Sequence, residues 1–253
     1  MAIVNEGLNK ELEWVTKPEE NLRIRGVLEN ARGILQDMAY GVIVGDQHEV
    51  DRLTREALDS GMNAETILDD GLIGGMSVVG VKFRDNVIFV PEVLVAARAM
   101  KAGMTHLEPI LSASEIEPLG RVIMGTVKGD LHDIGKNLCT MMLRGAGFEV
   151  HDLGVDTKAE EFIEAVREHD ADIVGMSALL TTTMENIGRN HKAFKEAGLR
   201  DRIKLMAGGA ALSVEMAKEM KADGYGRDAV ACVEKAKELL GIEEKTPVSV
   251  IDQ

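Results

Sequence analysis

The sequence predicts an α/β protein in which an N-terminal four-helix bundle precedes a Rossmann-like, flavodoxin-type domain built on a parallel sheet. Apolar residues recur at helical spacing through the first half of the chain. Beyond residue 120, short apolar runs alternate instead with helical stretches, as in parallel sheets covered by helices. The polar segment SASEIEPLG at 112–120 separates the two patterns, and its proline and glycine are typical of a linker.

Composition limits the classes of protein that the chain can represent. Its 253 residues, 45% of them hydrophobic, suffice for one or two domains with a buried core. The two cysteines, Cys139 and Cys232, form neither a CxxC pair nor a disulfide scaffold, which favours a reducing, cytoplasmic location. The N-terminus lacks a signal-peptide pattern, and no run of 18 uncharged apolar residues occurs, so we expect no membrane partner. A net charge of −14 opposes binding to nucleic acid.

Four helices are predicted before the linker. Apolar positions 24, 27, 28, 31, 34, 35, 38 and 42 predict one long helix. Asp46 and Asn63 are expected to cap the second and third helices, and Pro91 suits the first position of the fourth. The predicted helices cover residues 22–44, 46–60, 63–81 and 91–111. Short turns between them indicate an antiparallel bundle.

The second half alternates between predicted strands and helices. The strands are expected at 121–127, 148–153, 172–178 and 203–207. The helices are expected at 135–146, 158–169, 183–198, 213–221 and 228–240. The predicted organisation is therefore a polar extension (1–20), a helical cap domain (21–113), a sheet domain (119–241) and a polar tail (242–253).

Three loops follow predicted strands and would share the edge of the sheet at which α/β proteins bind ligands. The first, in MGTVKGDLHDIGKN, holds Asp130, His132 and Asp133 ahead of a helix, and its histidine suits a metal ligand, a general base or a polar turn. The second is SALLTTTM, and the third is MAGGAALS, whose paired glycines allow a ligand to approach the backbone. Each loop alone has an ordinary explanation as a capped helix start, so their combination and spacing carry the inference.

That combination resembles the signature of cobalamin-binding domains that hold cobalt through a protein histidine. The motif D-x-H-x-x-G is followed by S-x-L after 41 residues (136–176), and then by G-G after 28 residues (180–207). In the first half, GGMSVVGVKFRDNVIFVPEVL and AARAMKAGMTHLEPIL resemble the helical cap module of methionine synthase and of corrinoid proteins from anaerobic methyltransferase systems. The resemblance spans about residues 22–241, and it is strongest to the stand-alone corrinoid proteins that serve methanol, methylamine, methoxyaromatic and betaine demethylation.

The resemblance implies a role for each matching residue. His132 would be the axial ligand of cobalt, and Asp130 and Thr183 would continue a hydrogen-bond relay from its imidazole, with Thr183 where methionine synthase has serine. The lower face and nucleotide tail of the cofactor would contact Asp133, Ile134, Gly135, Ser177, Leu179, Thr181, Gly208 and Gly209. The upper, methyl-carrying face would be covered by Phe83, Val90, Val93 and Leu94.

The implied cofactor is cobalamin or a related cobamide, which would be methylcobalamin during turnover. The chain would accept a methyl group on cobalt(I) through a substrate:corrinoid methyltransferase. It would pass the methyl group to tetrahydrofolate or a thiol through a corrinoid:acceptor methyltransferase, and a reductive activase would restore cobalt(I). Such a carrier is not catalytic alone. The alternatives are a cobalamin-dependent sensor or regulator, an adenosylcobalamin mutase subunit, and a metallohydrolase that uses Asp130, His132 and Asp133.

Overall fold

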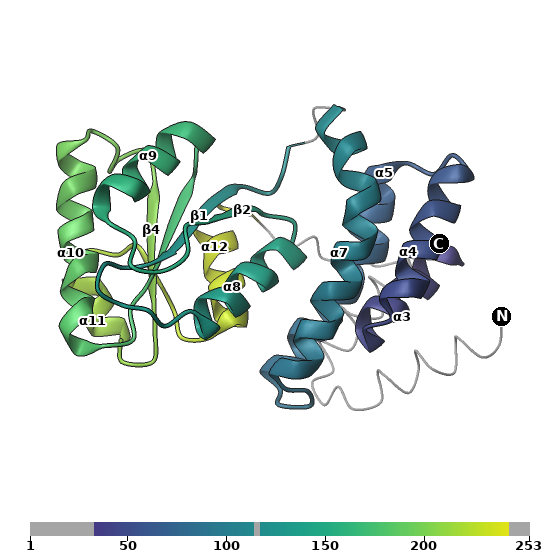
Figure 1. The fold of residues 1–253 in the computed structure, drawn as a ribbon, viewed down its shortest axis with the longest axis horizontal. Coiled ribbons are helices and arrows are strands. Elements are labelled where there is room, and N and C mark those ends of the chain that lie inside the picture. The colour runs from purple at the N-terminus through teal and green to yellow at the C-terminus, as the bar shows by residue number, and fades with distance from the viewer. Residues whose placement is uncertain (1–32, 114–116, 243–253) are drawn as a thin grey trace, which may run out of the picture. The chain divides into compact units, whose positions relative to one another are not determined.

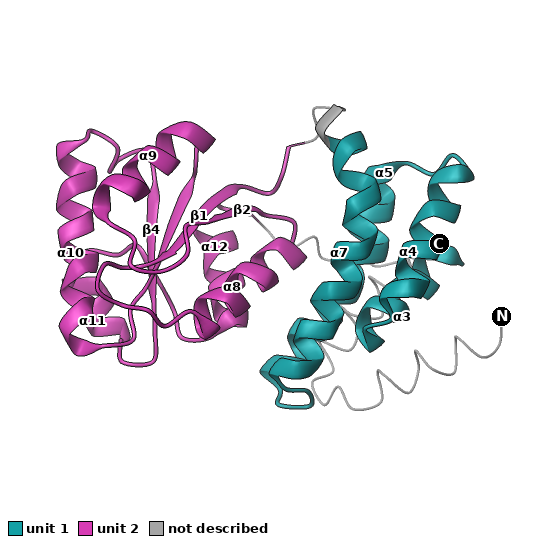
Figure 2. Cartoon of the chain, in the orientation of Figure 1, with its two compact units in different colours: residues 1–116, 244–253 teal, residues 117–243 magenta. Residues whose placement is uncertain are grey.

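The structure of the chain, a computed structural model, describes residues 33–113 and 117–242 (Figure 1). It divides between residues 116 and 117 into two compact units, here called the helical unit and the sheet unit (Figure 2). This division falls within the predicted linker. The predicted polar extension, the first part of the first predicted helix and all but the first residue of the polar tail lie outside the described residues. None of the described helices combines the length and apolar composition needed to cross a lipid bilayer.

The helical unit contains the elements expected after residue 33. They are α3 (Ile34–Val44), α4 (Gln47–Asp59), α5 (Ala64–Thr66), the π-helix η1 (Ile67–Ile73), α6 (Gly74–Arg84) and α7 (Val90–Ala113). The third predicted helix is thus three consecutive pieces, with a π-helical middle that the apolar pattern did not predict. Gly71 and Gly75 let this region approach α3, since added Cβ atoms would lie 2.7 Å from Met38 Sδ and from Ala39 O, respectively.

Side-chain caps fix the starts of two helices, as the sequence predicted. Asp46 Oδ1 accepts hydrogen bonds from the backbone N–H groups of His48 (3.2 Å) and Glu49 (3.1 Å). Asn63 Oδ1 accepts one from the N–H of Glu65 at 2.9 Å. These bonds satisfy amide groups that have no partner inside the first helical turn.

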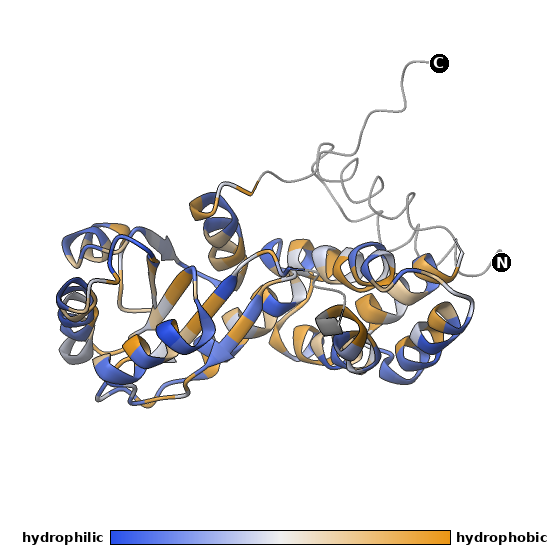
Figure 3. Cartoon of the chain, turned by 90° about the horizontal axis from the view of Figure 1, so that it is seen from above, coloured by the Kyte–Doolittle hydropathy of each residue, from blue (hydrophilic) through white to orange (hydrophobic). Residues whose placement is uncertain are grey.

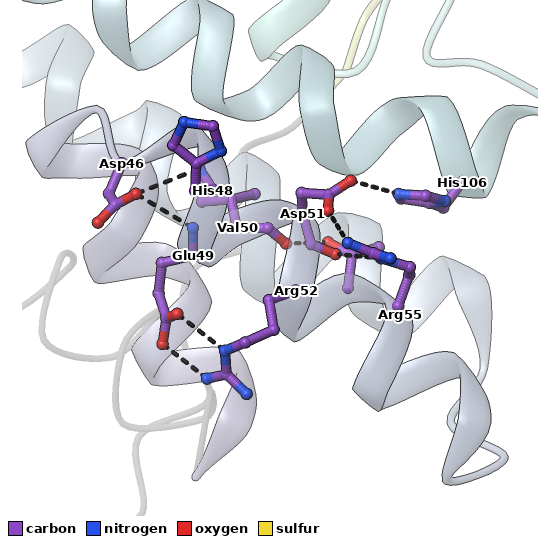
Figure 4. A network of polar contacts seen from close by, with 9 residues as sticks. Asp46, His48, Glu49, Val50, Asp51, Arg52, Arg55 and His106 are labelled. Carbon is purple, nitrogen blue, oxygen red and sulfur yellow. Dashed lines mark hydrogen bonds and ion pairs between the residues drawn. The ribbon is translucent and has the colours of Figure 1, made fainter.

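A polar network on α4 also connects this helix to α7 (Figure 4). Asp51 Oδ1 lies 2.7 Å from Nε2 of His106, and the other carboxylate oxygen contacts Arg55 one turn along the same helix. Arg52 binds Glu49 through two nitrogens, at 2.9 and 2.7 Å. Because solvent reaches all of these side chains, which are between 28% and 59% exposed, we expect each pair to contribute little to stability.

The sheet unit is built on five parallel strands in the order β2-β1-β3-β4-β5, which confirms the predicted flavodoxin-type α/β fold. The strands are β1 (Arg121–Thr126), β2 (Glu149–Asp152), β3 (Ile173–Ser177), β4 (Lys204–Gly208) and β5 (Gly224–Gly226). The first four match predicted runs within two residues at either end. The fifth was not predicted, because its Gly-Tyr-Gly sequence is too short and too poor in branched residues to show a strand pattern.

Helices cover both faces of this sheet (Figure 1). One buried cluster joins the sheet to α9 (Ala159–His169), α10 (Thr181–Glu196) and α11 (Val214–Glu219), and a second joins its other face to α8 (Ile134–Gly145) and α12 (Ala229–Leu239). The second cluster includes Cys232 and packs against Cys139, and both are free thiols. Figure 3 shows hydrophobic and hydrophilic residues alternating along these helices, as expected for elements with one buried face.

The carboxyl ends of four strands lie in one row. Thr126 of β1 is in register with Ser177 of β3, Ser177 with Gly208 of β4, and Gly208 with Gly226 of β5. The strand order reverses between β1 and β3, because the chain runs from β1 outward to β2 and then returns to the opposite side of β1. Such a switch point is where open α/β sheets form a ligand crevice. The loops after β1 and β3 therefore flank the expected binding position.

Candidate functional site

Asp130, in the loop after β1, is fully buried and joins the two loops at the switch point. Its Oδ1 accepts from the backbone N–H of His132 at 3.1 Å and lies 2.7 Å from the imidazole Nδ1 of the same residue. Its Oδ2 accepts from the N–H groups of Leu179 (2.8 Å) and Leu180 (3.2 Å), and lies 2.7 Å from Oγ1 of Thr183. The contacts of the predicted relay from Thr183 through Asp130 to His132 are therefore present at hydrogen-bonding distance.

The hydrogen bonds to Asp130 decide its charge. Burial by itself raises the pKa of the carboxyl, because it disfavours the ionised form. The bonds from Thr183, His132 and the backbone of Leu179 favour the carboxylate and outweigh burial, so the pKa of Asp130 lies well below its usual range. The carboxylate is consequently the form that accepts the Nδ1 proton of His132.

The side chain of His132 is 52% exposed, whereas that of Asp130 is buried. Asp130 engages Nδ1, which leaves Nε2 as the ring nitrogen available to an external ligand. A histidine that donates one N–H to a carboxylate and presents the other nitrogen outward is the arrangement that proteins use for metal ligation. The geometry thus favours the metal-ligand interpretation over the polar turn.

Two large apolar side chains near His132 are open to solvent. Leu131 and Ile134, which flank His132 and Asp133 in the sequence, are 72% and 77% exposed. A Cβ added at Gly135 would meet no atom within 4 Å. Asp133 is also exposed and accepts a hydrogen bond from Asn137 at 3.0 Å, so it holds the start of α8 and takes no part in the relay. An outward imidazole among exposed apolar side chains suits the face of a large, flat metal complex.

The loops after β3 and β4 contribute the other predicted residues of the sheet unit. Ser177 and Leu179 are half-buried, and Thr181 is exposed at the first position of α10. Ser177 lies opposite Gly208 across the β3–β4 pair, and the N–H of Ala178 donates to Gly208 O at 3.0 Å. The role of these residues in holding the nucleotide tail of a cofactor remains a prediction.

The paired glycines have a structural cause that the sequence interpretation did not include. Gly209 has a φ of +136°, and a Cβ there would lie 1.9 Å from Ala178 O. At Gly208, a Cβ would lie 3.0 Å from Gly226 O on β5. The backbone therefore requires glycine at 209 whether or not a ligand passes it, and any larger residue at 208 crowds the neighbouring strand.

The four residues predicted to cover the upper face of the cofactor differ in exposure. Phe83 at the end of α6 and Val90 at the start of α7 are half-buried, and Leu94 is 41% exposed. Val93 is fully buried and lies on the stripe of α7 that packs within the helical unit, which argues against its contact with a ligand. The same end of the unit exposes Phe89 by 62%, an aromatic residue that the sequence analysis did not select.

Three further residues hold the loop after β1 and were missed from the sequence. The hydroxyl of Thr126 donates to His132 O at 2.9 Å. Asp156, after β2, accepts from Gly129 N–H at 2.6 Å and donates its own N–H to Asp130 O at 3.0 Å. Asn186 on α10 donates to the carbonyl of residue 128 at 2.7 Å. The only sequence signal for Thr126 and Asp156 was that polar side chains end or follow strands, and Asn186, inside α10, gave none.

Comparison with known proteins shows which families the chain resembles. Two family models, both described as a B12 binding domain, match residues 34–108 and 120–234. A corrinoid protein of Desulfitobacterium hafniense (strain Y51) is 40% identical over 82% of this chain and 98% of its own length. Dimethylamine corrinoid protein 3 of Methanosarcina acetivorans is 43% identical over 82% of this chain and 97% of its own length.

Solved structures extend the comparison to the fold. The methanol:cobalamin methyltransferase complex MtaBC from Methanosarcina barkeri contains a chain that matches with a TM-score of 0.77 and 29% identity, covering 94% of this chain and 90% of that one.

Within the described residues, no three His, Cys, Asp or Glu side chains gather as ligands for a metal ion, as the metallohydrolase alternative would require. Because curated relatives exceed 30% identity over nearly their whole length, the chain belongs to the family of corrinoid proteins with B12-binding domains that serve methyltransferase systems.

Proposed function

We propose that this chain carries a methyl group on the cobalt of a corrinoid and that His132 is the axial protein ligand of that cobalt. The observation that carries the proposal is the buried Asp130 carboxylate, which orients the Nδ1 side of an otherwise exposed imidazole at the sheet's switch point. Family membership supports cobalamin or a related cobamide as the cofactor. When bound, the cobalt supplies the chemistry of accepting and releasing the methyl group.

The residues around His132 have separate tasks in this proposal. Asp130 fixes the tautomer and raises the basicity of the imidazole, as carboxylates behind metal-bound histidines do. Thr183 holds Asp130 from the first turn of α10, directly after the loop that follows β3. Leu131 and Ile134 are exposed beside His132, so they would contact the corrin ring and exclude water from it. Ser177, Leu179, Thr181, Gly208 and Gly209, at and after the ends of β3 and β4, would hold the nucleotide tail.

We further propose that the partners are a substrate:corrinoid methyltransferase, a corrinoid:acceptor methyltransferase and a reductive activase. The relatives named for dimethylamine and the methanol:cobalamin methyltransferase complex support partner methyltransferases. Phe83, Val90 and Leu94, which are half-buried or exposed in the helical unit, are the residues that we propose would contact the upper face of the cofactor. The dimethylamine relatives make dimethylamine the first methyl donor to test.

Electron paramagnetic resonance tests the axial ligand directly. The protein is labelled uniformly with ¹⁵N, loaded with unlabelled hydroxocobalamin, and reduced to the cobalt(II) state. An axial nitrogen splits the cobalt(II) signal, and ¹⁵N gives a doublet where ¹⁴N gives a triplet. We expect the ¹⁵N doublet, because the ligand is the protein's imidazole rather than the cofactor's own benzimidazole.

The variant His132→Ala should lose the doublet, give a base-off visible spectrum and bind hydroxocobalamin about tenfold more weakly or worse. The exposed His48 on α4 supplies the control, since His48→Ala should leave the signal unchanged. A ¹⁴N triplet in the labelled wild type, or a ¹⁵N doublet that persists in His132→Ala, would show that the axial ligand is wrongly assigned.

A further inference from the structure

The position of His132 depends on a loop with no regular structure of its own. Residues 127–133 leave β1, turn Asp130 into the protein, turn His132 outward and enter α8. A side chain that ligates a metal loses much of its effect when it is misplaced by an ångström, so the loop backbone must be held as well as the ring. Asp130 accepts hydrogen bonds from the imidazole and the backbone N–H of His132. Neither bond restrains the backbone carbonyl group of His132.

Thr126 restrains that carbonyl. It is the last residue of β1 and is fully buried, and its hydroxyl donates to His132 O at 2.9 Å. Its own backbone is fixed by the sheet: it lies in register with Ser177 of β3, and its carbonyl accepts from Thr157 N–H at 2.9 Å. The bond therefore closes a six-residue span from a rigid strand end directly to the proposed ligand residue.

The burial of a threonine in this unit does not by itself demand such a bond. Thr140 and Thr157 are also buried, 3% and 2% exposed, and the hydroxyl of each has no hydrogen-bond partner in the structure. Their hydroxyls are tolerated without a specific acceptor. The Thr126 hydroxyl, by contrast, donates a hydrogen bond to the backbone carbonyl of His132.

We propose that Thr126 is a positioning residue, which holds His132 at the height and angle needed for its Nε2 to reach the metal. Asp156 supports the same loop from the side of β2, through its bonds to Gly129 and to the carbonyl of Asp130. The proposal rests on the proposed ligand role of His132 and adds that the strand, as well as the Asp130 carboxylate, sets the position of the ligand.

The test compares Thr126→Val, which keeps the branched shape but removes the hydroxyl, with Thr126→Ser, which keeps the hydroxyl. After circular dichroism has confirmed folding, each variant is titrated with hydroxocobalamin, and its visible spectrum and cobalt(II) resonance are recorded. We expect Thr126→Val to bind about tenfold more weakly and to show a larger base-off fraction, and Thr126→Ser to restore both values. Thr157→Val, which removes a buried hydroxyl without a partner, should behave as wild type.

A second readout does not need the cofactor. Hydrogen–deuterium exchange at the N–H of His132 should be faster in cofactor-free Thr126→Val than in wild type and normal in Thr126→Ser, because the loop opens more often without the bond. Unchanged affinity, spectrum and exchange in Thr126→Val would overturn the inference, as would a Thr126→Ser variant as weak as the Val variant. If Thr126→Val and Thr126→Ala both fail to fold while Thr126→Ser folds, the hydroxyl serves the fold and not the ligand.

These outcomes are separate from those that test the ligand assignment. A wild-type spectrum in His132→Ala would remove the proposed ligand and, with it, the basis of the inference. A base-off His132→Ala beside a wild-type Thr126→Val would leave the ligand in place and would refute only the role of Thr126.

Discussion

Two carboxylate–histidine pairs in this chain share a contact distance but differ in their surroundings. Asp130 Oδ1 lies 2.7 Å from Nδ1 of His132 in the sheet unit, and Asp51 Oδ1 lies 2.7 Å from Nε2 of His106 in the helical unit. The Asp130 side chain is 0% exposed and its histidine 52%, whereas those of Asp51 and His106 are 33% and 28% exposed.

The two carboxylates differ in their remaining hydrogen-bond and ion-pair partners. Asp130 draws two backbone N–H groups and a hydroxyl from a loop about fifty residues away, so its position is set by the fold. Asp51 is completed by Arg55 on its own helix, and water can replace either partner. Contact distance alone does not distinguish a functional site from a surface ion pair. The two pairs differ in burial: a buried Asp130 carboxylate held by the fold lies against an exposed imidazole, so that the ring is oriented and Nε2 faces outward.

The largest expected effect comes from removing the charge of the buried carboxylate. In Asp130→Asn, the amide NH₂ must face either the donors from residues 179, 180 and 183 or the N–H of His132, so a donor meets a donor in both orientations. We expect the free energy of unfolding of the cofactor-free protein to fall by about 2–3 kcal/mol in urea denaturation. The exposed Asp133→Asn is the control and should stay within about 0.5 kcal/mol of wild type.

Acidification should reduce the difference between wild type and Asp130→Asn in the free energy of unfolding. Because the pKa of Asp130 is lowered in the folded protein, the unfolded chain takes up this proton at a higher pH than the folded one. The stabilisation is therefore complete above the ordinary aspartate pKa of about 3.9 and is lost as the pH falls below it. Between pH 7 and pH 3, the gap between wild type and Asp130→Asn should shrink by about 1 kcal/mol. A constant gap would mean that the charge of Asp130 is not what stabilises the loop.

Removing one donor from the buried carboxylate should have a smaller effect. Thr183→Val deletes the hydroxyl but keeps the branched shape, and we expect a loss of about 1 kcal/mol in the free energy of unfolding. Thr182 is exposed at the preceding position of α10, so Thr182→Val provides a matched control on the same helix turn. Equal losses in the two variants would contradict a specific role for the bond to Asp130.

The smallest effect is expected at the half-buried pair of Asp51 and His106. Asp51→Asn removes the carboxylate that contacts His106 and Arg55, yet solvent reaches and salt screens both contacts. Its melting temperature should fall less than that of Thr183→Val, and the difference from wild type should vanish in 1 M NaCl. A loss as large as that of Asp130→Asn would erase the distinction between the two pairs.

The sequence predicted those parts of the molecule in which residues close together in the sequence determine the secondary structure. The caps at Asp46 and Asn63 and the apolar runs of β1 to β4 depend on local pattern, and they were found. The π-helix η1 arises where glycines let α3 approach closely, a tertiary effect without a local signature.

The candidate site divides in the same way. Asp130, His132 and Thr183 were selected because their spacing resembles a family motif, and the structure places them in one hydrogen-bonded relay. Thr126 belongs to a strand pattern, and Asp156 to a turn, so neither stood out from its neighbours. The role of Thr126 depends on how its own loop folds back over the strand end, and that of Asp156 on contacts between the loops after β1 and β2, and no sequence pattern reveals either.

The exposure of Leu131 and Ile134 has a consequence for stability if a ligand covers them. A ligand that covers these side chains and binds only the folded chain adds its binding energy to folding, by about 2.7 kcal/mol when its concentration is 100 times its dissociation constant. Chains that lack the ligand would unfold more often and meet proteases more often. The supply of corrinoid would then set the lifetime of the carrier as well as its activity.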